Sequence, residues 1–89
     1  MLRVTTTDER STTVKLKVEG RIASEWTDVL ERECRARLQQ RRSVLLDFSG
    51  VTFVDRSGVE LLKSFSREDI EIINCSAFIE GLLTEEQAQ

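Results

Sequence analysis

The chain has 89 residues, of which 39% are hydrophobic and 33% are charged, and its formal net charge is -3. This length favours a single domain over residues 1–89 with one modest hydrophobic core. The net negative charge argues against nucleic acid or an anionic membrane surface as the main partner. No stretch approaches the roughly 18 apolar residues of a membrane span, so we expect no integral membrane segment and a cytoplasmic location.

Several kinds of chemistry are disfavoured by what the sequence lacks. There is no histidine, which excludes Ser-His and Cys-His nucleophilic sites and histidine metal sites. Cys34 and Cys75 lack Cys-x-x-Cys spacing and fall in apolar patterns, so we expect two free thiols. No glycine-rich motif for binding phosphate is present. We therefore expect no metal, no cofactor and no enzymatic activity.

The first twenty residues predict an antiparallel hairpin. Residues 2–5 alternate between apolar and polar, which indicates a short edge strand, and the polar residues 7–10 indicate a turn. Residues 13–19 alternate again, as expected for a strand with one apolar face. Gly20 is expected to end that strand.

A long amphipathic helix is predicted next. Ser24 is expected to be its N-cap, and Glu25 and Asp28 place negative charge in the first turn, where the helix dipole favours it. Packing against the core accounts for this helix, and we assign no chemistry to it. Apolar residues recur along it at three- and four-residue spacing: Trp26, Val29, Leu30, Cys34 and Leu38.

The chain is organised around the stretch from residue 43 to residue 61. Residues 44–46 form a continuous apolar run, typical of a strand covered on both faces. Ser49 and Gly50 supply turn chemistry, and a short apolar segment follows. The polar residues 55–58 then open a helix of apolar periodicity. The end of a strand beside the start of a helix is where a two-layer α/β protein exposes chemistry.

The last third of the chain predicts a short helix, a strand and a final helix. The apolar pattern of the first helix stops near Phe65, and residues 70–73 include three β-branched side chains that favour a strand. Ser76 is expected to cap the last helix, and residues 84–89 are expected to form a frayed tail.

The predicted order is therefore β-β-α-β-α-β-α. It indicates an α/β fold in which α-helices pack on a mixed four-stranded β-sheet through right-handed crossovers. The predicted core contains Leu16, Val18, Trp26, Leu30, Val44, Leu46, Phe53, Leu62, Ile72 and Phe78.

The central motif resembles the signature of the STAS domain. In that family an apolar strand ends in Asp-Leu-Ser-Gly, and Asp-Ser-Ser-Gly or Asp-Ser-Thr-Gly follows after an apolar stretch. Residues 47–50 match the first part, and Asp55, Ser57 and Gly58 match the second. Arg56 departs from the small residue usual there. The resemblance implies a STAS-like fold that is truncated relative to the family, because the family usually has a longer second helix and continues with a further strand and helix.

The resemblance also implies a function. It indicates a regulatory protein–protein binding module of the anti-sigma factor antagonist type, with an anti-sigma factor serine kinase as partner. In the family, the unphosphorylated domain binds this kinase and frees the sigma factor, and phosphorylation reverses the effect. Ser57 matches the family's phosphorylated serine and is the candidate phosphoacceptor. Asp55, Arg56 and Gly58 complete the candidate phosphoacceptor loop.

Simpler roles remain open for the same residues. A hydroxyl at a helix N-terminus is accessible to a kinase, and backbone amides and the dipole favour the product phosphate there. Ser57 or Asp55 could instead be only a helix cap, and Gly58 could serve only a tight turn. Arg56 could pair with a phosphate or block the docking of a kinase.

The expected partner surface extends from this loop along the following helix. Glu60 and Lys63 are polar positions on a helix whose other face is apolar. An alternative function belongs to another class: small STAS proteins also serve as cytosolic accessory subunits of lipid-transporting ABC systems, without an established phosphorylation switch. The short helix and Arg56 favour this alternative. The sequence does not indicate an oligomeric state.

Overall fold

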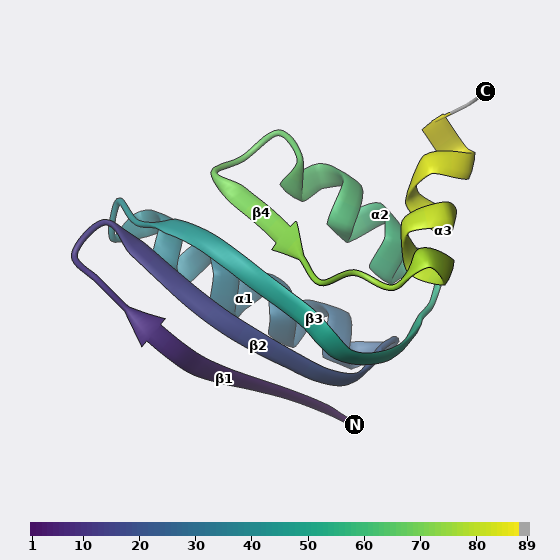
Figure 1. Ribbon diagram of the computed structural model, residues 1–89, viewed down its shortest axis with the longest axis horizontal. Coiled ribbons are helices and arrows are strands. Elements are labelled where there is room, and N and C mark those ends of the chain that lie inside the picture. Colours follow the sequence, from purple (N-terminus) through teal and green to yellow (C-terminus); the bar gives the residue numbers. More distant parts are fainter. Residues whose placement is uncertain (88–89) are drawn as a thin grey trace.

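Four strands and three helices follow one another in the predicted order (Figure 1), in a computed structural model that describes residues 1–87. The elements are β1 (Leu2–Glu9), β2 (Thr13–Ile22), α1 (Glu25–Gln39), β3 (Ser43–Val54), α2 (Arg56–Phe65), β4 (Ile70–Ile73) and α3 (Ala77–Gln87). None of the helices in this part of the chain is long and apolar enough to cross a membrane.

The strands form one mixed sheet in the order β1-β2-β3-β4. β1 pairs antiparallel with β2, whereas the β2–β3 and β3–β4 pairs are parallel. The predicted mixed four-stranded sheet is therefore confirmed. Because β2, β3 and β4 run in the same direction, the connections to α1, α2 and α3 all leave from one edge of the sheet, at the right of Figure 1.

One face of the sheet carries the core. Val14 pairs with Val44, and Val44 pairs with Ile70, so these buried side chains share a face. α1 and α2 contact the sheet and each other, and Figure 1 shows α1 behind the strands. The opposite face carries Lys15 and Glu71, and Lys15 alternates with apolar residues as the sequence of β2 predicted.

The predicted core is correct in most positions and wrong at Phe53 and Phe78. Leu16, Val18, Leu30, Val44, Leu46 and Leu62 are buried. Trp26 and Ile72 are partly buried and pack against that core. Phe53 is half-buried beneath the guanidinium of Arg21, whose Cζ lies 4.4 Å from the ring centroid. Phe78 is 68% exposed, because the buried side of α3 is supplied by its neighbour Ile79.

The first hairpin is longer than predicted. β1 extends to Glu9, so the expected turn at residues 7–10 lies mostly within the strand, and the actual turn follows Arg10. Gly20 lies inside β2 rather than at its end. Its φ is 102°, and a Cβ there would lie 2.3 Å from the carbonyl oxygen of Met1. Gly20 therefore permits close strand pairing instead of ending the strand.

β3 is one continuous strand, so the turn predicted at Ser49 and Gly50 is wrong. β2 continues to pair beside these residues through two shifts of register, and Gly50 lies opposite Glu19. A Cβ at Gly50 would lie 2.7 Å from Cγ of Glu19. Gly50 therefore lies at an irregularity in strand pairing. A glycine favours such an irregularity as well as a turn, so its presence in the sequence does not distinguish the two.

α3 begins as predicted. Oγ of Ser76 accepts a hydrogen bond from the backbone N–H of Ile79 at 3.2 Å. The helix continues to Gln87, so the tail predicted over residues 84–89 begins within a helix, and residues 88 and 89 lie outside the described residues.

Candidate functional site: the start of helix α2

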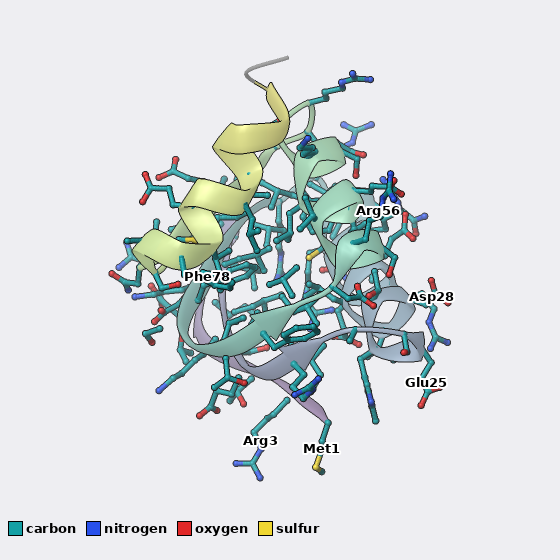
Figure 2. All side chains as sticks on the ribbon, turned by 90° about the vertical axis from the view of Figure 1, so that its right-hand side faces the viewer. Met1, Arg3, Glu25, Asp28, Arg56 and Phe78 are labelled. Atoms are coloured by element: carbon teal, nitrogen blue, oxygen red, sulfur yellow. The ribbon has the colours of Figure 1, made fainter. Side chains whose placement is uncertain are left out.

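The second part of the STAS-like motif, residues 55–58, lies where β3 ends and α2 begins. Figure 2 views this end of the molecule, with Arg56 labelled at the first residue of α2. The neighbouring strand β2 ends at Ile22, opposite Val54 in the parallel register. The loop that leads into α1 therefore lies beside the loop that leads into α2.

The carboxylate of Asp55 connects these two loops. Asp55 is the N-cap of α2, and its Oδ1 accepts hydrogen bonds from the backbone N–H of Gly58 at 2.8 Å and from the Ser57 hydroxyl at 2.9 Å. Its Oδ2 accepts a hydrogen bond from the backbone N–H of Ser24 at 3.0 Å. The Gly58 and Ser24 amides lower the pKa of Asp55, because they stabilise the ionised form.

Ser57 is exposed in the first turn of α2, and its hydroxyl donates to Asp55. The capping role that the sequence left open between the two residues belongs to Asp55. The oxygen of Ser57 thus lies at a helix N-terminus, where free amides and the dipole favour an anion. This position is compatible with a phosphoacceptor.

The sequence predicts that Ser24 caps α1, but its side chain does not do so. It occupies the N-cap position, but its side chain makes no capping hydrogen bond, and its φ of 54° and ψ of -132° are rare outside glycine. The backbone N–H of Ser24 is instead used by Asp55. The sequence pattern does not predict this hydrogen bond, because Ser24 and Asp55 are 31 positions apart.

Gly58 allows α2 to pack closely on the end of β2. A Cβ at this position would lie 2.8 Å from the carbonyl oxygen of Ile22 and 2.8 Å from Cγ1 of Val54. Gly58 is buried, and its backbone does not adopt a positive φ. The close approach is therefore to a strand of the same chain, and a tight turn is not the reason for a glycine here.

The remaining predicted residues lie along the outer side of α2. Arg56 and Glu60 are exposed one helical turn apart, and Lys63 is half-buried one turn further on. The opposite side of α2 is buried through Val59, Leu61, Leu62 and Phe65. The structure thus brings Arg56, Ser57, Glu60 and Lys63 onto one surface, whereas Gly58 is buried.

Asp47 ties the middle of β3 to the end of β4, at the other half of the motif. Its Oδ1 accepts hydrogen bonds from the backbone N–H of Ser49 at 3.0 Å and from Nδ2 of Asn74 at 3.1 Å. Both bonds lower the pKa of Asp47. No group of acidic or cysteine side chains in the described residues could hold a metal ion.

Comparison with known proteins identifies the family. The model of the family described as "Mlab, STAS domain" matches residues 5–83. Among solved structures, the chain is similar to the anti-sigma factor antagonist SpoIIAA in its unphosphorylated form, with a TM-score of 0.73 and 18% sequence identity. That match covers 97% of this chain and 94% of the other, so the expected truncation is not evident against this structure. No curated protein matches. The chain belongs to the STAS domain family.

Proposed function

We propose that this chain is a regulatory protein-binding module of the anti-sigma factor antagonist type, switched by phosphorylation of Ser57. The observation that carries the proposal is the Ser57 hydroxyl, which is exposed at the N-terminus of α2 and held 2.9 Å from Asp55. The similar solved structure is named an anti-sigma factor antagonist in its unphosphorylated form, which supports such a switch. The proposed partner is an anti-sigma factor serine kinase in the cytoplasm, and the chain itself catalyses nothing.

The proposed partner surface comprises the loop Asp55–Gly58 together with Glu60 and Lys63. Apart from the buried Gly58, these residues follow one another along the start and outer side of the same helix, so one docking partner can cover them. The buried side of α2 fixes the orientation of the helix, and the Asp55 hydrogen bonds fix the loop. The surface is therefore organised before a partner arrives, which lowers the entropic cost of binding.

Phosphorylation of Ser57 should change binding more than folding. A phosphate adds about -1.5 to -2 charges at the centre of this surface. The helix N-terminus stabilises an anion by roughly 0.3 to 1 kcal/mol, and Arg56 can add a charge-assisted hydrogen bond, whereas the nearby Asp55 carboxylate opposes the new charge. The domain should stay folded. A partner shaped for the neutral hydroxyl would have to desolvate a dianion that it cannot pair.

The deciding experiment incubates the protein with a purified anti-sigma factor serine kinase and ATP, and maps phosphate by mass spectrometry. We expect phosphate on Ser57. Ser49 is also exposed but lies in a strand, and Ser64 Oγ donates to the carbonyl of Leu61, so both serve as internal controls. Ser57→Ala should bind the kinase and escape phosphorylation. Ser57→Asp should fold normally and bind at least about tenfold more weakly, a loss of roughly 1.4 kcal/mol.

Two results would contradict the proposal. The first is phosphate on Ser49 or Ser64 but not on Ser57. The second is equal kinase affinity of Ser57→Ala and Ser57→Asp. Either result would leave Ser57 as a side chain that only donates a hydrogen bond to Asp55.

A second candidate function is a cytosolic accessory subunit of a lipid-transporting ABC system. The observations that favour it are the end of α2 at Phe65 and the exposed Arg56 at its first position, where the family usually has a small residue. This candidate predicts that the protein copurifies with an ATPase subunit and that Ser57→Asp leaves the complex intact. Loss of the complex on Ser57→Asp would favour the phosphorylation switch.

A further inference from the structure

Phe78 is an exposed aromatic side chain without a structural explanation in the fold. It is 68% exposed, and Met1 is the other large hydrophobic side chain that is exposed among the described residues. The core does not use Phe78, because Ile79 is 2% exposed and Leu82 and Leu83 pack against the core from the same helix. The fold should therefore tolerate its removal.

The first turn of α3 holds Phe78 in a defined position. Oγ of Ser76 accepts a hydrogen bond from the backbone N–H of Ile79. The carbonyl oxygen of Ser76 accepts a hydrogen bond from the backbone N–H of Glu80 at 2.9 Å. The backbone on both sides of Phe78 is thus fixed. An aromatic ring on a fixed backbone has few rotatable bonds to immobilise, which makes it an efficient binding contact.

Phe78 lies at the same end of the molecule as Ser57. β3 and β4 are parallel, so α2 and α3 both start from the edge at which these strands end. The two helices also contact each other. Figure 2 looks onto this end, with Arg56 at the start of α2 and Phe78 at the start of α3.

The proposed partner surface is too small to form a complex without additional residues. It contains six residues, Asp55 to Gly58 with Glu60 and Lys63, whereas a standard interface uses roughly 20 to 30 residues on each side. A partner on Ser57 must therefore cover neighbouring elements. Towards α1 it meets Glu25 and Asp28, and acidic residues are depleted in interface centres; towards α3 it meets Phe78, and aromatic residues are enriched there.

We propose that Phe78 is an apolar anchor of the partner surface. The protein that covers Ser57 also extends over the start of α3 and receives the Phe78 ring in an apolar pocket. This inference rests on the proposed function, since it assigns a second contact to the same partner. It differs from that function because the contact made by Phe78 does not depend on phosphorylation of Ser57.

The test measures binding of the purified anti-sigma factor serine kinase to the full chain by calorimetry. Phe78→Ala should weaken binding at least about tenfold, as expected for an interface hot spot, and Phe78→Leu should lose less. The denaturation midpoint of both variants should match that of the wild type. Arg67→Ala is the control, because Arg67 is exposed in the connection between α2 and β4, at the opposite edge of the sheet.

The outcomes separate this inference from the proposed function. Binding that is weakened by Ser57→Asp but unchanged by Phe78→Ala overturns the anchor and leaves the switch. Binding that is weakened by Phe78→Ala but insensitive to Ser57→Asp supports the anchor and overturns the switch. A wild-type protein that does not bind the kinase overturns both. A lowered denaturation midpoint for both Phe78 variants overturns the anchor, because Phe78 would then belong to the core.

Discussion

Asp55 accepts hydrogen bonds from three donors, of which Ser24 lies 31 positions away in the sequence. Its carboxylate accepts hydrogen bonds from Ser24, Ser57 and Gly58, and so connects the start of α1 with the start of α2. The hydrogen bond that the backbone N–H of Ser24 donates to Asp55 also stabilises a backbone conformation that is otherwise unfavourable outside glycine. Asp55 therefore does more than cap one helix, and it keeps the Ser57 hydroxyl in place.

Replacing Asp55 with Asn should alter the dependence of stability on pH. The Asp55 pKa is lowered in the folded protein, so the carboxylate contributes stability above its unfolded pKa of about 3.9 and loses it as the pH falls through the folded pKa. Urea unfolding should show wild type more stable than Asp55→Asn at pH 7. The difference should shrink below about pH 4. A constant difference from pH 7 to pH 3 would mean that the charge of Asp55 contributes nothing.

The two cysteines are free, and they should react at different rates. Burial, with a smaller contribution from Glu33, raises the pKa of Cys34 to about 12, whereas Cys75 is only partly buried. Since the thiolate is the reactive form, a thiol reagent at pH 8 should modify Cys75 well before Cys34 in the native protein. Both should react in urea without a reductant. Fewer than two reactive thiols in urea, and above all none, as a disulfide would leave, would contradict the expectation of two free thiols.

At the scale of the elements, periodic strands could be predicted and irregular pairing could not. Val14, Leu16 and Val18 alternate with polar residues, and all three are buried as predicted. Local propensity favours a turn at Gly50, because it contains no information on the pairing of β2, which continues beside Gly50 through a shift of register. The unpredicted part of β3 thus depends on a contact with a distant strand.

In the helices too, local sequence patterns do not predict features that depend on distant contacts. Residues 78, 79, 82 and 83 share one helical pattern, but which flank of α3 turns inward depends on how the helix docks, and Ile79 rather than Phe78 is buried. At the candidate site, the motif predicted Asp55, Ser57 and Gly58, whereas the contribution of Ser24 depends on adjacent loops. Side-chain roles that depend on distant contacts could not be predicted.

The assignment of the central strand can be tested at Leu46. Its side chain is fully buried in β3, which pairs with β2 and β4, so Leu46→Ala should lower the free energy of unfolding by about 2 to 5 kcal/mol. Leu45 is the matched control, because it is the adjacent leucine and lies half-buried on the other face of the sheet. Leu45→Ala should cost less. A loss under about 1 kcal/mol for Leu46→Ala in denaturant unfolding would contradict this placement.

At the scale of the whole molecule, the edge of the sheet at the carboxyl ends of the parallel strands differs from the edge at their amino ends. One edge carries the starts of all three helices, with Ser57, Arg56 and Phe78 exposed. The other end of the molecule is joined by ion pairs: Arg42 with Glu9, and Arg35 with Glu68 at 2.6 Å. These pairs connect α1 and the loop that follows it to other elements. This arrangement is consistent with the proposed partner surface at the first edge and with a structural role for the second.

A charge reversal on α2 tests this division. Glu60 is exposed on the proposed partner surface, so Glu60→Lys should weaken kinase binding by roughly tenfold at low salt, equivalent to about 1.4 kcal/mol. Its effect should shrink at 0.15 M salt, where the Debye length is about 8 Å, and the free energy of unfolding should not change. Arg41→Glu is the control, because Arg41 is exposed after α1 at the other edge. If Arg41→Glu weakens binding and Glu60→Lys does not, the partner docks on the edge to which we assign a structural role.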